Sequence, residues 1–113
     1  MSYEPFQTVI VPFPFTDRAA SKRRPALVLS SAAFGTAVGH SVLAMITSQK
    51  NAPWAFDVAL VDLASAGLPA PSVVRMKLFT LDHRLIQATI GQLSAEDEEV
   101  VTTTLHRLFP WLP

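Results

Sequence analysis

Short apolar runs, broken by proline, glycine and serine, recur along the chain and predict a mainly β protein. Six runs are expected as strands: residues 8–11, 25–30, 41–47, 56–61, 72–79 and 85–93. A polar loop runs from Thr16 to Arg24, residues 31–39 form a connection of small residues, and residues 63–68 form a single turn closed by Gly67. Closely spaced short strands are typical of a small barrel or a strongly bent sheet.

The last part of the chain has helical periodicity. Ser94 is a candidate N-cap, with Asp97 three residues later, and the acidic residues 96–99 fill the first turn, where the helix dipole favours negative charge. One apolar face follows at helical spacing: Val101, Leu105 and Leu108. Pro110 is expected to end the helix. We therefore expect a single domain over residues 1–113, mainly β (α+β), with about five to seven strands and a C-terminal helix.

Composition narrows the class of protein. Half of the 113 residues are hydrophobic and the mean hydropathy is +0.32, more apolar surface than so short a chain easily encloses, so a homodimer is expected. The absence of cysteine excludes disulfides, thiolate metal sites and thiol catalysis. The N-terminus lacks the pattern of a signal peptide, and no apolar run reaches the roughly 20 residues that span a bilayer. We expect a cytoplasmic protein with no membrane partner.

Charge is distributed unevenly although the net charge is zero. Residues 1–56 contain five basic and two acidic residues, whereas residues 57–113 contain four basic and seven acidic ones. Four of the basic residues lie in the polar loop: Arg18, Lys22, Arg23 and Arg24. Such a run either binds nucleic-acid phosphates or is simply a solvated loop.

Four segments carry a resemblance to a known family. They are residues 8–17 (TVIVPFPFTD), 22–30 (KRRPALVLS), 45–48 (MITS) and 72–82 (SVVRMKLFTLD), the last followed by IGQLS at 90–94. In order and spacing they resemble the MazF/PemK (Kid, CcdB-like) toxins of type II toxin–antitoxin systems. The resemblance implies a small SH3-like barrel with a C-terminal helix, a homodimer and a cognate antitoxin. It also implies a sequence-specific endoribonuclease that cuts single-stranded RNA with no metal or other cofactor, leaving 2′,3′-cyclic phosphate and 5′-OH ends.

The same resemblance suggests roles for individual residues. Arg24 and Thr47 fall at catalytic positions, and Arg75 falls at a position used for RNA contact or catalysis. An arginine suits a phosphate because it stays charged and presents paired planar donors, and a hydroxyl adds one more hydrogen bond. Further RNA-binding residues are expected among the neighbouring polar and basic positions: Arg18, Lys22, Arg23, Ser48 and Lys77. The general base is open between Asp17 and, among the histidines, His83.

Two other functions fit the sequence. A CcdB-like toxin would poison a protein target and would not need the pair of Arg24 and Thr47. An inactive binding module is compatible with the first loop and with Lys77, where some relatives carry an acid. Phe13, Phe15 and Trp54 are candidates for stacking on RNA bases, although at least one of the phenylalanines is expected in the core.

Overall fold

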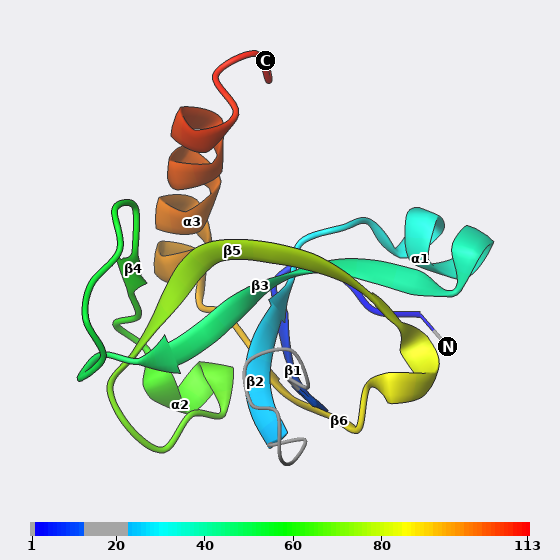
Figure 1. The fold of residues 1–113 in the computed structure, drawn as a ribbon, viewed down its shortest axis with the longest axis horizontal. Coiled ribbons are helices and arrows are strands. Elements are labelled where there is room, and N and C mark those ends of the chain that lie inside the picture. The colour runs from blue at the N-terminus through cyan, green and yellow to red at the C-terminus, as the bar shows by residue number, and fades with distance from the viewer. Residues whose placement is uncertain (1, 13–22) are drawn as a thin grey trace.

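A computed structural model describes residues 2–12 and 23–113 and shows within them one antiparallel sheet in the order β4-β5-β3-β2-β1-β6. The strands are β1 (Gln7–Pro12), β2 (Arg23–Val28), β3 (His40–Ser48), β4 (Val58–Ala59), β5 (Ser72–Asp82) and β6 (Ala88–Gln92). The sheet is curled, with β5 arching across the molecule (Figure 1). The predicted mainly β class, with about five to seven strands and a C-terminal helix, is confirmed.

Helices lie around this sheet. They are α1 (Ala32–Val38), α2 (Leu63–Ala66) and α3 (Ala95–Leu108), with a short 3-10 helix η1 (His83–Leu85) between β5 and β6. The helices α3 and α1 stand at opposite sides of the arch (Figure 1). The prediction that residues 31–39 form only a connection is wrong, because Ser31 caps a helix there and Gly39 ends it with a φ of 70°. The helix was not predicted because its small residues have no apolar periodicity.

Other predicted strand boundaries also differ. β4 contains only two residues instead of residues 56–61, since Phe56 has a φ of 70°, outside the extended region. β5 continues to Asp82, η1 takes Leu85, the first residue predicted for the sixth strand, and β6 begins only at Ala88. Arg23 and Arg24, predicted in the polar loop, begin β2, while residues 13–22 of that loop lie outside the described residues.

The two faces of the sheet have separate apolar clusters. One face packs against α2 and α3 through residues including Leu27, Ile46, Val74 and Val101. The other, which we call the Tyr3 face, is a cluster of Tyr3, Val9, Val11, Ala26, Val28 and Leu43, closed at its margin by Met45, Phe79, Leu81 and Ile86. Because side chains alternate along a strand, residues two positions from these share the Tyr3 face.

The helix α3 is fixed at its start by buried polar contacts. The Ser94 side chain accepts a hydrogen bond from the Asp97 amide, which confirms the predicted cap. Asp97 itself is buried, and its carboxylate accepts hydrogen bonds from the amides of Val61 and Asp62 at 2.9–3.2 Å. This acid therefore ties α3 to the segment that follows β4. It is not simply a surface charge favoured by the helix dipole.

Candidate functional site

The register of β2 and β3 brings the two predicted catalytic residues to one end of the sheet. Ala26 and Met45 form the last pair of this antiparallel ladder, and Arg24 and Thr47 each stand two residues further along their strands at that same end. Both residues keep the alternation of Ala26 and Met45, so both belong to the Tyr3 face. A cation and a hydroxyl thus lie on neighbouring strands just beyond the apolar cluster. We call this pair the Arg24–Thr47 site.

The buried Nε of Arg24 has no hydrogen-bond acceptor among the described residues. Arg24 is half-buried, and its backbone is paired with Val11 of β1. A buried donor without an acceptor costs about 1–3 kcal/mol, so native proteins rarely keep one without a reason. An anionic ligand oxygen would supply the acceptor.

Thr47 has an oriented hydroxyl. Only 5% of the residue is exposed, and its Oγ1 accepts a hydrogen bond of 2.6 Å from Asn51 Nδ2. Asn51 is held in the turn after β3 because its backbone N–H donates a hydrogen bond to the Ser48 carbonyl oxygen. Since a hydroxyl that accepts one hydrogen bond keeps its own proton to donate, Thr47 can still act as a donor toward a ligand.

Arg75 holds the loop between β3 and β4 (residues 49–57, the β3–β4 loop) against β5. Its Nε and Nη2 donate to the two carboxylate oxygens of Asp57 at 3.1 and 2.9 Å, and Nη2 also donates to Ala52 O at 2.8 Å. The side chains of the pair are only 9% and 12% exposed. Because Asn51 belongs to the same loop, this clamp supports the group that orients Thr47.

The ion pair between Arg75 and Asp57 shifts the pKa of both groups. Burial alone would raise the pKa of Asp57, but hydrogen bonds from Arg75 and from the Trp54 amide, with the charge of Arg75, hold it below its ordinary value. The hydrogen bond to Asp57 raises the pKa of Arg75 against the opposing effect of burial. Both groups therefore stay charged at neutral pH.

The other predicted RNA-binding residues lie around the Arg24–Thr47 site or outside the described residues. Lys77 lies on β5 two residues beyond Arg75, on the same face, whereas Arg23 is exposed and alternates to the opposite face from Arg24. Ser48 follows Thr47, and its Oγ accepts a hydrogen bond from the Lys50 amide. Several other candidates lie outside the described residues: Arg18, Lys22, Asp17, Phe13 and Phe15.

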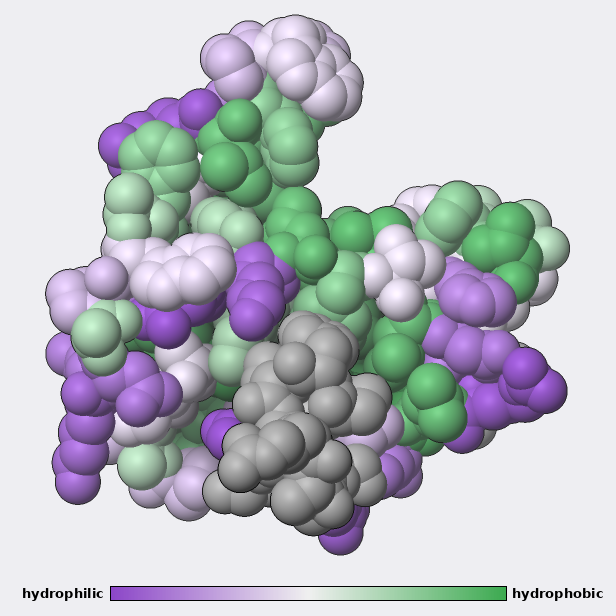
Figure 2. Space-filling view, in the orientation of Figure 1, coloured by the Kyte–Doolittle hydropathy of each residue, from purple (hydrophilic) through white to green (hydrophobic). Residues whose placement is uncertain are grey.

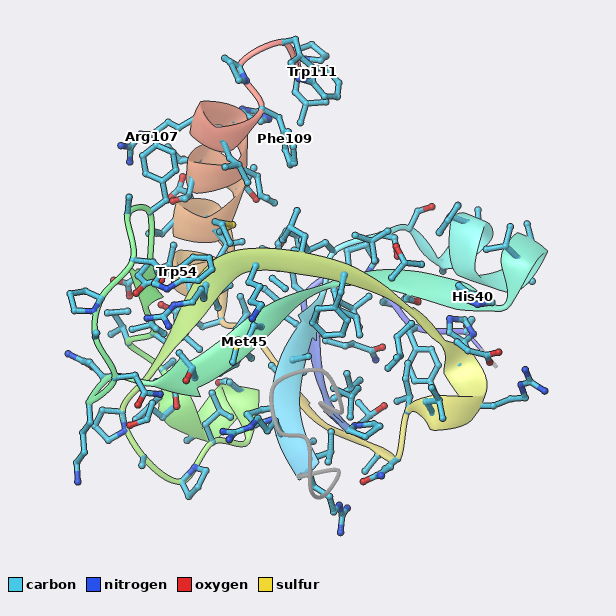
Figure 3. All side chains as sticks on the ribbon, viewed as in Figure 1. His40, Met45, Trp54, Arg107, Phe109 and Trp111 are labelled. Carbon is cyan, nitrogen blue, oxygen red and sulfur yellow. The ribbon has the colours of Figure 1, made fainter. Side chains whose placement is uncertain are left out.

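His83 lies at the other end of the sheet. Its Nε2 and the Oγ of Ser41 are 2.8 Å apart, and its ring packs edge-on against Tyr3. Six residues separate Ser41 from Thr47 along β3, or about 20 Å of strand. Figure 3 shows this separation, with His40 and Trp54 at opposite ends of the arch and Met45 between them. The hypothesis that His83 transfers a proton in the Arg24–Thr47 site is therefore wrong.

Sequence reasoning missed two residues of the site. Asn51 touches Thr47, and Asp57 pairs with Arg75, but both stand in an irregular loop where periodicity carries no information. Asn51 follows the strand that ends at Thr47 closely, whereas Asp57 lies within residues 56–61, which the sequence predicts as a separate strand. Among the described residues, no group of three or more histidine, aspartate or glutamate side chains is arranged to hold a metal ion. No helix in that part of the chain is long and apolar enough to cross a membrane.

The curled antiparallel sheet with its C-terminal helix is shared with solved structures of MazF toxins. The family model described as the PemK-like, MazF-like toxin of type II toxin–antitoxin systems matches residues 4–109. The chain therefore belongs to this family, which confirms the resemblance found in the sequence.

Solved structures agree with this assignment. MazF of Deinococcus radiodurans (Form-I) is 25% identical and covers 97% of this chain and 98% of its own, with a TM-score of 0.74. The Mycobacterium tuberculosis toxin MazF-mt6 is 26% identical, covers 92% and 96%, and has a TM-score of 0.73. A MazE–MazF complex (Form-II) from Deinococcus radiodurans is 23% identical, covers 96% of both chains, and has the same fold with a TM-score of 0.72. No curated relative matches the chain significantly.

Proposed function

We propose that this toxin is a metal-independent endoribonuclease that cuts single-stranded RNA to 2′,3′-cyclic phosphate and 5′-OH ends. The observation that supports it best is the Arg24–Thr47 site itself, in which a buried arginine donor has no acceptor among the described residues. Membership of the MazF-like family supports the same activity.

The chemistry needs a charged donor where the phosphate reacts. The RNA 2′-oxygen attacks the adjacent phosphorus as its proton goes to a base, the new P–O2′ bond forms, and the P–O5′ bond breaks as the 5′-oxygen takes up a proton. Arg24 would bind the non-bridging oxygens, whose charge grows in the transition state, and Thr47 would donate a second hydrogen bond. Loss of one such donor typically lowers the rate by about 10²–10³. The identity of the base stays open, and Asp17 is a candidate from the sequence alone.

The other predicted RNA-binding residues have different proposed roles. Arg23 is exposed beside Arg24 and, with Arg18, Lys22, Ser48 and Lys77, is proposed to contact the RNA backbone. Arg75 is proposed to act as a positioning residue, because its Nε and Nη2 already bind Asp57 and the Ala52 carbonyl. This role differs from the direct RNA contact expected from the sequence.

A cognate antitoxin is the proposed protein partner. Three of the similar structures are described as MazE–MazF from Deinococcus radiodurans, and another as an endoribonuclease with its cognate antitoxin from a mycobacterial species. An acidic antitoxin segment would give Arg24 the acceptor that the described residues do not provide.

A homodimer is proposed on the basis of one apolar groove. Leu29, Val42, Leu78, Leu105, Phe109 and Leu112 line it together with Ser30, between the end of α3 and the sheet. Figure 2 shows hydrophobic residues gathered in the notch between α3 and α1. Sedimentation of the purified toxin should give a dimer, and Leu112→Glu should shift it toward monomer. A wild-type monomer would contradict this proposal and leave the antitoxin as the occupant of the groove.

RNA cleavage in EDTA tests the proposed activity. Wild-type toxin, Arg24→Ala and Thr47→Ala are incubated with a long single-stranded RNA, and the new ends are identified. Arg84→Ala is the matched control, because Arg84 pairs with Asp82 at the other end of the sheet. We expect discrete cuts by wild type and the control, and a loss of at least about 100-fold in the two site variants.

Other outcomes separate the alternatives. If the folded wild type, free of antitoxin, cuts none of several RNAs, the nuclease proposal fails and a CcdB-like toxin acting on a protein, or an inactive binding module, takes its place. Equal cutting by wild type and Arg24→Ala would show that the site is wrongly assigned or that the activity is a contaminant.

A further inference from the structure

We propose that Trp54 forms a stacking subsite for a nucleobase that flanks the cleaved phosphate. The inference rests on the proposed function, since it assumes that single-stranded RNA crosses the Arg24–Thr47 site. It selects Trp54 from the aromatic candidates of the sequence and gives it a place: an aromatic surface for a base beside the groups for the phosphate.

One face of the Trp54 ring is held by the protein while the residue stays open to solvent. The guanidinium of Arg75 lies 5.1 Å from the ring centroid, and 47% of the residue is exposed. Arg75 is itself fixed by Asp57 and Ala52, so the cation under the ring does not move freely. A cation against one face leaves the other face of an indole available for stacking.

The backbone of Trp54 is also fixed. Its amide donates to Asp57 Oδ2 at 2.9 Å, and the Asp57 amide donates back to Trp54 O at 3.3 Å. The same carboxylate thus holds both the ring's own backbone and the arginine beneath the ring. An aromatic group preorganised in this way loses little conformational entropy when a base stacks on it.

The ring also lies beside the proposed reaction site. Arg75 is paired with Met45 in the register, and Val73 with Thr47, so the cation under Trp54 is two positions from Thr47 along the same edge. The β3–β4 loop that carries Trp54 also carries Asn51, which binds Thr47. A nucleotide chain whose phosphate meets Arg24 and Thr47 therefore has its next base within reach of the indole.

The other exposed tryptophan provides a contrast. Trp111 is 75% exposed beyond the end of α3 and contacts Phe109, remote from the site (Figure 3). Replacing it by phenylalanine leaves Trp54 as the single tryptophan of the chain. The intrinsic fluorescence of the Trp111→Phe protein then reports on the proposed subsite alone.

The first experiment titrates Trp111→Phe protein with a 2′-O-methyl oligonucleotide that spans a mapped cut and lacks the attacking hydroxyl. We expect saturable quenching of Trp54. The control is the same oligonucleotide made abasic at the positions next to the cut, which keeps every phosphate. It should bind more weakly and leave most of the fluorescence unchanged. Equal quenching by both oligonucleotides would overturn the inference.

The second experiment compares Trp54→Ala with Trp54→Phe. Loss of the ring should weaken binding of the intact oligonucleotide by roughly 10- to 100-fold, whereas phenylalanine should retain most of the affinity. Neither variant should alter binding of the abasic oligonucleotide by more than about threefold, which separates stacking from a general disturbance of the loop. Equal affinity of Trp54→Ala and wild type for the intact oligonucleotide would overturn the inference.

These results are distinguishable from a failure of the proposed function. If RNA is cut normally by Trp54→Ala, the nuclease proposal stands and the subsite is wrong. If wild type neither cuts nor binds RNA, both proposals are wrong. If an antitoxin peptide quenches Trp54 but no oligonucleotide does, the ring is part of the antitoxin surface and the inference is likewise overturned.

Discussion

Asp57→Asn removes the charge that holds the β3–β4 loop and leaves Arg75 without its anion. The carboxylate accepts two hydrogen bonds from Arg75 and one from the Trp54 amide. An asparagine amide offers one oxygen and turns an NH2 group toward a donor. Breaking a buried pair costs about 3–5 kcal/mol. Because the pair lies near the surface, with about a tenth of each side chain exposed, we expect a loss of about 2–4 kcal/mol.

Urea unfolding at neutral pH measures this loss. The midpoint should fall by more than about 1 M, with an unchanged slope. All variants are compared at one protomer concentration, because dimerisation would make the stability depend on concentration. Glu99→Gln is the matched control, since that acid is exposed on α3, and its effect should stay within about 0.5 kcal/mol. If Asp57→Asn is as stable as this control, the ion pair is not the clamp that we describe.

Three further predictions follow from the same contacts. Arg24→Met should abolish cleavage yet leave the melting temperature unchanged or raised, because it removes a buried donor that lacks a described acceptor. Asp97→Ala should lower the free energy of unfolding by about 2–4 kcal/mol, since two backbone amides lose their acceptor, whereas Glu99→Ala should not. The contribution of Asp57 and Asp82 to stability should be complete well above the ordinary aspartate pKa of about 3.8 and be lost as the pH drops through and below that value, because hydrogen bonds lower the folded-state pKa of both groups. Urea titrations at several pH values should show a shallower fall for Asp57→Asn.

Regular elements were predictable because their patterns are local. The apolar runs at residues 41–47 and 72–79 predict the central strands β3 and β5, and Ser94 with the acids after it predicts the start of α3. α1 was missed because alanine, glycine and threonine carry no apolar period. The strand predicted over residues 56–61 was too long because no sequence pattern indicates the positive φ of Phe56. Such failures occur where tertiary contacts, and not local preference, decide the backbone.

The site was predictable only in its regular part. Thr47 ends one predicted strand and Arg24 directly precedes another, and the pairing of Ala26 with Met45 brings both to the same end of the sheet. The contacts of Arg75 with Asp57 and Ala52 join residues 18 and 23 positions apart through an irregular loop, so no spacing rule could indicate them. The direct role for Arg75 in RNA contact stays a prediction, and its observed partners favour positioning.

The two ends of the Tyr3 face differ in how their polar side chains are hydrogen-bonded. At one end the Ser41 hydroxyl is paired with His83, and the ring of His83 packs against Tyr3, so the polar groups meet one another. At the other end Asn51 and Asp57 satisfy Thr47 and Arg75, while Arg24 Nε has no acceptor in the described chain. A ligand that supplies this acceptor binds the folded chain more tightly than the unfolded one and so must stabilise the fold. RNA and an acidic antitoxin segment would then compete for one unsatisfied donor, so the feature proposed to give activity would also be the feature by which the antitoxin controls it.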